Sequence, residues 1–92
     1  MTSYEFEVAA KNAVLKVLEE EFDILLSIQD LELVWFTHVI GNKKCLIYSR
    51  EMGTLYAEVT WVKDDMVMYV DMYRKQSHRA FRGGSLDFEV KA

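Results

Sequence analysis

The sequence has 92 residues, enough for one small domain, and its hydrophobic fraction of 51% supports a core and excludes disorder. A net charge of −4 disfavours a general nucleic-acid-binding surface, and the single cysteine excludes an internal disulfide. No apolar run approaches the length of about 20 residues that spans a membrane, and the first residues lack a signal-peptide pattern. We therefore expect one cytoplasmic domain over residues 1–92, with no membrane partner.

The first third of the chain has the pattern of an amphipathic helix. Thr2 and Glu5 have the spacing of a capping box, in which each side chain accepts a hydrogen bond from the backbone amide of the other residue. Apolar residues then recur at steps of three and four, which predicts one buried stripe: Ala9, Ala10, Ala13, Val14, Val17 and Leu18. We expect the helix to end between Phe22 and Leu26, with a loop around 27–30.

Four later segments have the composition of β-strands separated by turns. The predicted strands are 32–40, 43–49, 54–62 and 66–74, with turns at Gly41-Asn42, at 50–53 and at 63–65. The predicted fold is α+β: an N-terminal helix packed on one face of a four-stranded antiparallel meander. A fifth edge strand at 86–90 is an alternative extension after Gly83-Gly84, and residues 75–82 fit either a continued strand or a helical turn.

The turns also predict a register, and the register sorts the side chains into two faces. A two-residue loop at Gly41-Asn42 pairs His38 with Cys45, and the later turns pair Cys45 with Glu58 and Glu58 with Asp71. The helix-covered face is then Leu33, Trp35, Thr37, Val39, Leu46, Tyr48, Leu55, Ala57, Val59, Trp61, Met68, Val70 and Met72. The second face is Val34, Phe36, His38, Ile40, Cys45, Ile47, Ser49, Tyr56, Glu58, Thr60, Val62, Val67, Tyr69, Asp71 and Tyr73. It is too apolar for a solvated surface, so we expect the C-terminal segment, a second subunit or a partner to cover it.

In this register His38, Cys45, Glu58 and Asp71 form one row across the sheet. A cysteine beside a histidine can be an activated nucleophile, and facing carboxylates can share a proton or hold a cation. Strands about 4.8 Å apart spread the row over roughly 14 Å, too far for one metal ion to take all four ligands. No oxyanion or phosphate device accompanies the row. We interpret it as a polar stripe with Cys45 as a small filler, and expect no enzyme activity, no cofactor and no metal.

A basic cluster follows the last predicted strand. It consists of Arg74, Lys75, His78, Arg79 and Arg82, with Tyr73 and Phe81 interleaved. Such a mixture can bind phosphates and stack bases, which makes single-stranded nucleic acid an alternative partner through Arg74, Lys75, Arg79 and Arg82. The acidic total favours a solvated segment instead.

Several segments resemble a family of short phage and prophage proteins of Gram-positive bacteria. The similar segments are Val34-Trp35-Phe36, 44–47, 53–60 and 69–75, within a similarity that covers roughly residues 5–81. Cys45 and the tail from Gly83 depart from the family pattern. The resemblance implies a phage setting and supplies neither an activity nor site residues.

These observations favour a phage-type protein that binds a host protein. Such a protein would inhibit a host enzyme or defence system, as an anti-CRISPR does, and the association is by analogy with other small phage proteins. The predicted partner-binding residues are Phe36, His38, Tyr56, Glu58, Tyr69, Asp71 and Tyr73, because aromatic residues suit a binding patch. A homodimer through the same face and a nucleic-acid-binding accessory protein are the alternatives.

Overall fold

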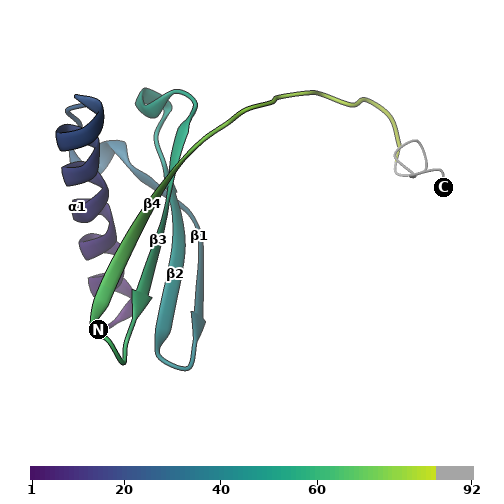
Figure 1. Ribbon diagram of the computed structural model, residues 1–92. Helices are drawn as coiled ribbons and strands as arrows, with labels where there is room; N and C mark the ends of the chain where they lie inside the picture. Colours follow the sequence, from purple (N-terminus) through teal and green to yellow (C-terminus); the bar gives the residue numbers. More distant parts are fainter. Residues whose placement is uncertain (85–92) are drawn as a thin grey trace.

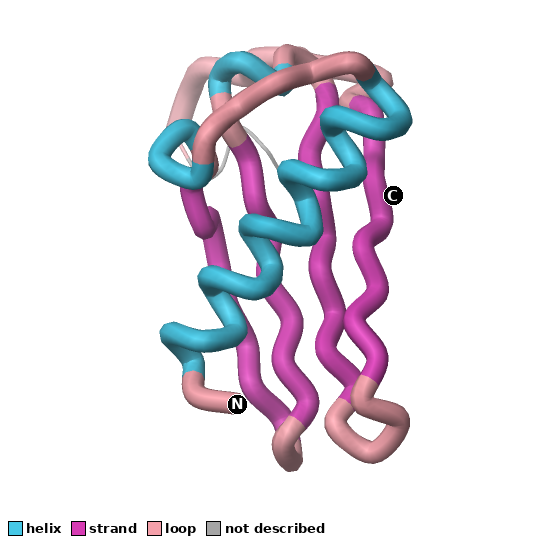
Figure 2. Tube along the Cα trace, turned by 90° about the vertical axis from the view of Figure 1, so that its left-hand side faces the viewer, coloured by secondary structure: helices cyan, strands magenta, loops and turns pink. Residues whose placement is uncertain are grey.

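The arrangement of the chain comes from a computed structural model, which describes residues 1–84. One helix, α1 (Ser3–Phe22), lies across one face of an antiparallel sheet with the strand order β1-β2-β3-β4 (Figures 1 and 2). The strands are β1 (Glu32–Val39), β2 (Asn42–Tyr48), β3 (Leu55–Val62) and β4 (Val67–Arg74), with short 3-10 turns at η1 (Ile28–Asp30) and η2 (Arg50–Met52). The expected α+β fold is confirmed. The fifth strand expected at 86–90 lies outside the described residues.

Helix α1 begins at the capping box that the sequence predicted. The Glu5 amide donates to Thr2 Oγ1 at 3.1 Å, and the Thr2 amide donates to Glu5 Oε1 at 2.8 Å. The hydrogen bond from the Thr2 backbone amide, and then one from the Thr2 side chain, lower the pKa of Glu5, since they favour its carboxylate form. The helix ends within the expected range, at a left-handed Asp23. Within residues 1–84, no helix is both long and apolar enough to cross a membrane.

The buried stripe of α1 repeats every four residues and meets the middle of the sheet. Its fully buried members are Phe6, Ala10, Val14 and Leu18. Three of these belong to the predicted stripe, Phe6 is an addition, and Ala9, Ala13 and Val17 are only partly buried at its margins. The stripe packs on Cys45, Ile47, Ala57 and Val59, none of which has accessible surface. Removing such side chains from water supplies most of the stabilisation of this small fold.

The predicted register is confirmed between β3 and β4 and wrong between β2 and β3. Glu58 pairs with Asp71 as expected. Cys45, however, pairs with Val59 and not with Glu58. The connection between β2 and β3 holds one residue more than a four-residue loop, because η2 is followed by Gly53 and Thr54 before β3 begins. A slip of one residue turns every side chain of a strand to the other face.

The slip exchanges the two faces of β2 and of most of β1. The first turn is also displaced, to Ile40-Gly41 with φ of 48° and 83°, so His38 pairs with Lys43 and not with Cys45. A shift of two residues leaves the same β1 and β2 side chains on a common face, so both strands change sides together. Trp35, Thr37, Val39, Leu46 and Tyr48, expected under the helix, lie on the other face. Phe36, His38, Cys45, Ile47 and Ser49, expected on that other face, lie on the helix side.

A β-bulge returns the start of β1 to its expected side. The register shifts between Leu33, which pairs with Ile47, and Trp35, which pairs with Leu46. Leu33 therefore faces the helix as predicted, while Phe36 also faces it and places its ring 5.8 Å from that of Phe6. A bulge carries one extra residue on one strand, so the alternation of β1 restarts after it.

The segment after β4 is neither a strand nor a helix. Its last ladder bond is donated by the Lys75 amide to the Thr54 carbonyl at 2.8 Å. Residues 75–84 are all exposed and leave the body of the protein, at the end of the sheet opposite the N-terminus (Figure 1). This segment therefore does not cover the face of the sheet that α1 leaves free.

Candidate functional site

The face of the sheet opposite α1 is the candidate functional site, and we call it the open face. It collects side chains from all four strands: Glu32, Trp35, Thr37, Val39, Lys44, Leu46, Tyr48, Tyr56, Glu58, Thr60, Val62, Val67, Tyr69, Asp71 and Tyr73. Helix α1 lies on the other side of the sheet (Figure 1), and no element within residues 1–84 packs on this one. An antiparallel sheet with one free face is ordinarily polar there, and this face is half apolar.

Three large aromatic side chains of the open face are exposed to solvent. Tyr69, Tyr73 and Trp35 are 50%, 42% and 40% exposed. Tyr73 stacks on its cross-strand partner Tyr56, with ring centroids 5.3 Å apart and planes 16° from parallel. Stacking of this kind stabilises the pair by about 0.5–1.5 kcal/mol beyond the burial of its area. The face therefore presents aromatic surface to the solvent, with two of its rings in contact with each other.

An ion pair and an excess of carboxylates lie between these rings. The Lys44 ammonium is 2.9 Å from Glu58 Oε1, and its hydrogen bond to Glu58, then the charge of Glu58, raise the pKa of Lys44. Tyr73 and Asp71 add smaller contributions to that rise. Glu58 lies opposite Asp71, and Glu32 extends the same side of β1 opposite Tyr48. Three carboxylates against one ammonium leave the face with a charge of −2.

Five of the seven predicted partner-binding residues come together on this face. They are Tyr56, Glu58, Tyr69, Asp71 and Tyr73. Phe36 and His38 are the exceptions. They lie on the helix side, because the observed register turns this part of β1 to the face opposite the predicted one. The sequence analysis missed Trp35, Val39, Lys44, Leu46 and Tyr48. Gly41 was the signal that could have corrected the register. Glycine favours the second position of a two-residue hairpin turn, where φ is positive, and this preference places the turn at Ile40-Gly41.

The row of His38, Cys45, Glu58 and Asp71 does not form. Glu58 and Asp71 face each other on the open face, while Cys45 is fully buried under α1 between Phe36 and Val59. Burial, and then the charge of Glu7, raise the pKa of the Cys45 thiol to about 11. A buried protonated thiol is a poor nucleophile. In the described part of the chain, no three His, Cys, Asp or Glu side chains gather to hold a metal ion.

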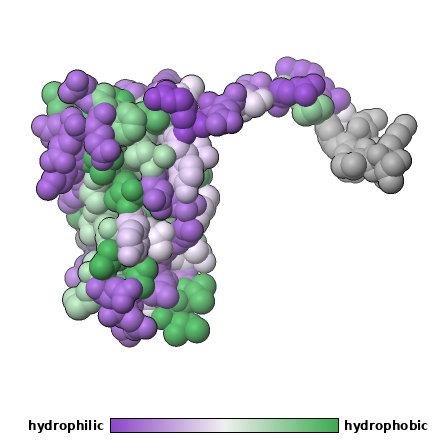
Figure 3. Space-filling view, in the orientation of Figure 1, coloured by the Kyte–Doolittle hydropathy of each residue, from purple (hydrophilic) through white to green (hydrophobic). Residues whose placement is uncertain are grey.

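The basic cluster belongs mainly to the segment that leaves the sheet. Arg74 is the last residue of β4, and its guanidinium donates to Thr54 Oγ1 at 3.1 Å. Further along, the Arg79 guanidinium lies 5.2 Å from the centre of the Phe81 ring. Figure 3 shows the segment as a mostly hydrophilic arm beside a body with large apolar areas. The cluster is thus separate from the open face.

Comparison with known proteins identifies a family but no function. A model described as a family of unknown function, DUF6275, matches residues 7–83, which include α1 and all four strands. Neither the curated proteins nor the solved structures gave a match.

Proposed function

The chain belongs to DUF6275, a family of unknown function, and we propose that it acts by binding a partner protein through the open face of its sheet. The observation that carries this proposal is the exposed aromatic surface opposite α1. Tyrosine and tryptophan are enriched at protein interfaces because they bury a large area while losing little conformational freedom. Trp35, Tyr69 and Tyr73 supply that surface from both edges of the sheet.

The size of the open face supports a separate partner over a second copy of the chain. Four strands of seven or eight residues, about 3.3 Å per residue and about 4.8 Å apart, give an area of roughly 500 Å². Two copies packed face to face would bury roughly 1,000 Å², at the lower limit for a specific interface. A partner that also contacts an edge strand would bury more.

Charge supports the same choice and gives the partner its chemistry. Glu58 and Asp71 lie beside each other near the middle of the face, and its total charge is −2. In a face-to-face dimer two surfaces that each carry a charge of −2 would face each other, which is unfavourable. A partner with a basic patch would instead be attracted. We therefore propose a basic surface on the partner, with aromatic contacts at Tyr69 and Tyr73.

The finer identity of the partner rests on the resemblance to phage proteins. If that setting holds, the partner is a host protein, and binding would inhibit a host enzyme or defence system as an anti-CRISPR does. The proposed place of action is the cytoplasm, since the lone cysteine fits a reducing compartment.

Capture and affinity measurement with matched variants test the proposal. The wild-type protein is immobilised and used to capture partners from a lysate of the host cells. Each captured partner is then purified and titrated against the protein by calorimetry. We expect Tyr69→Ala to weaken binding by at least about tenfold, as for an aromatic residue that carries much of the binding energy of an interface. Asp71→Lys should also weaken it, and added salt should reduce the affinity.

Control variants lie on the exposed side of α1. Glu20→Lys makes the same charge change as Asp71→Lys, away from the sheet, and should leave the affinity unchanged. A partner that binds Tyr69→Ala and Asp71→Lys as tightly as wild type would disprove the role of the open face. A dimer mass by light scattering at micromolar concentration, reduced to a monomer by Tyr69→Ala, would support the homodimer instead.

The exposed basic arm keeps single-stranded nucleic acid as a second candidate. Residues 75–84 are accessible along their length, and Arg79 and Phe81 together offer a cation and a ring. This function predicts salt-dependent gel shifts with single strands that are lost in Arg79→Ala/Arg82→Ala. A flat titration at low salt would remove it.

A further inference from the structure

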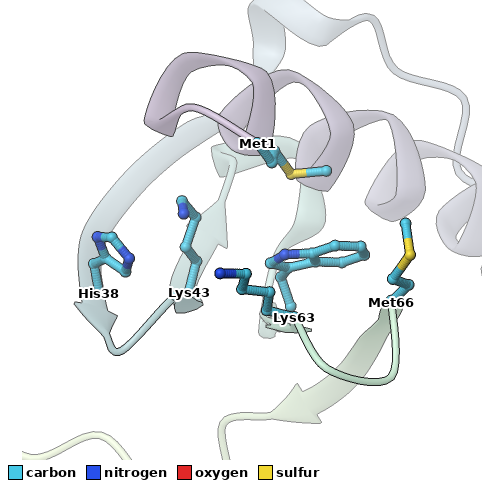
Figure 4. A pocket seen from close by; sticks show the side chains of 7 residues that line it. Met1, His38, Lys43, Lys63 and Met66 are labelled. Carbon is cyan, nitrogen blue, oxygen red and sulfur yellow. The ribbon is translucent and has the colours of Figure 1, made fainter.

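A pocket lies at the end of the sheet opposite the basic arm, on the helix side. It has a volume of about 470 Å³ and lies between the start of α1 and the two hairpin turns (Figure 4). Its lining includes His38 and Lys43 from the first hairpin, and Trp61, Lys63 and Met66 from the second. None of the lining side chains is acidic. The pocket is therefore a cationic hollow in a protein whose net charge is negative.

Lys43 is the most unusual side chain of this pocket. It is only 6% exposed, and within residues 1–84 its ammonium has no ion pair or hydrogen bond. Lys11 and Lys44, by contrast, each lie 2.9 Å from a glutamate oxygen. No fully buried side-chain nitrogen in the described residues lacks a partner, so the Lys43 Nζ atom keeps accessible surface. Lys43 therefore buries its aliphatic stem and keeps an accessible ammonium without a carboxylate partner among the described residues, which leaves that charge available to an anionic ligand.

Lys63 brings a second ammonium to the pocket, and the two turns fix its place. The Lys63 amide donates to Asn42 Oδ1 at 2.9 Å, which ties the second hairpin to the first. The side chain then crosses Gly41 so closely that a Cβ atom there would lie 2.6 Å from Lys63 Cδ. Figure 4 shows Lys63 extending towards Lys43. The φ of 83° at Gly41 favours glycine in the turn, and the absence of a side chain there leaves room for the Lys63 side chain in this position.

The remaining walls are apolar and aromatic. Trp61 contributes an indole ring to the lining, and Met1 and Met66 contribute their thioether side chains. Two ammonium groups suit the charge of a phosphate, for which lysine is a common ligand. The volume falls within the range of about 300–1,000 Å³ that small-molecule sites occupy. Cations and an indole in one pocket suit a phosphate that carries an apolar or aromatic group.

We propose that this pocket binds a small organic phosphate. Its phosphoryl group lies between Lys43 and Lys63, and its apolar part lies against Trp61. This site is separate from the open face, because Lys43 and Trp61 point to the helix side of the sheet. The inference therefore does not depend on the proposed partner binding.

Tryptophan fluorescence provides the test, since Trp61 is one of only two tryptophans. In a Trp35→Phe background the emission reports the pocket alone. Phenyl phosphate, inorganic phosphate and phenol are titrated separately at low ionic strength, up to about 10 mM. We expect saturable binding of phenyl phosphate, at least about tenfold tighter than binding of either inorganic phosphate or phenol.

Two lysine variants and one matched control decide the site. Lys43→Met keeps an unbranched side chain that is one heavy atom shorter and removes the charge, and we expect it to weaken phenyl phosphate binding at least about tenfold. Lys63→Met should also weaken phenyl phosphate binding. Lys63 is exposed, so this substitution should not disturb folding. Lys44→Met removes a charge from the next residue on the opposite face and should leave binding unchanged. Absence of saturation, or equal binding by wild type, Lys43→Met and Lys63→Met, would overturn the proposal.

Discussion

The two faces of the sheet are formed by the same four strands, but one is buried beneath α1 and the other is accessible to solvent. On the helix side, Cys45, Ile47, Ala57 and Val59 have no accessible surface. On the open face, their neighbours along the chain remain accessible, among them Leu46 and Glu58 at intermediate exposure. The difference arises because one helix can cover only one side of a sheet. Stability and recognition can therefore be altered separately, by substitutions one residue apart.

Ile47 and Leu46 provide the sharpest test of this comparison. Ile47→Ala removes a fully buried side chain beneath α1 and should reduce the free energy of unfolding by about 2–5 kcal/mol. Leu46→Ala removes a partly exposed one and should reduce it by less than about 1.5 kcal/mol. Urea denaturation of both variants measures the two values. Equal losses would mean that the open face is buried in solution.

Cys45 gives the helix-covered face a pH dependence of its own. Burial raises the pKa of its thiol from 9.0 to about 11. The unfolded chain ionises first as the pH rises, so stability present below pH 9 is lost towards pH 11. The loss attributable to Cys45 between pH 8 and pH 10 should be about 1 kcal/mol.

The comparison of wild type with Cys45→Ala isolates this contribution. Other groups that ionise in the same range affect both proteins, so the difference between their denaturation curves reports the thiol. We expect wild type to lose more stability than Cys45→Ala as the pH rises. Parallel pH dependences would show that the thiol is accessible in the folded protein.

Tyr73 should show the smallest effect on stability. Its stacked contact with Tyr56 is a cross-strand pair on an accessible face, and such pairs contribute about 0.2–1 kcal/mol. Tyr73→Ala should therefore lower the free energy of unfolding by no more than about 1 kcal/mol, measured by urea denaturation beside Ile47→Ala. A loss as large as that of Ile47→Ala would contradict the contrast between the two faces.

Local chemistry made the elements predictable. The capping box of Thr2 and Glu5, the recurrence of Ala10, Val14 and Leu18, and the alternation along β3 and β4 each depend on residues close in sequence. The pairing of Glu58 with Asp71 followed as well, because a short turn joins their strands. These parts of the fold needed no knowledge of distant contacts.

The candidate site was only partly predictable because the alternation of β2 is ambiguous. Its two sets, Asn42, Lys44, Leu46 and Tyr48 against Lys43, Cys45, Ile47 and Ser49, each combine a lysine with apolar and polar residues. Either set suits a core, so the pattern could not detect a slip of one residue. The bulge between Leu33 and Trp35 likewise has no marker in the sequence.

The amino-acid sequence by itself determined the helix, the four strands and the inward side of β3 and β4, since these depend on periodicity and on nearby turns. Only the tertiary structure decided which side of β1 and β2 meets α1. That choice depends on a loop containing the 3-10 turn η2 and on the contact of Phe36 with Phe6. It places Trp35 on the open face and Lys43 in the pocket, because a shift of one residue reverses every side chain of a strand.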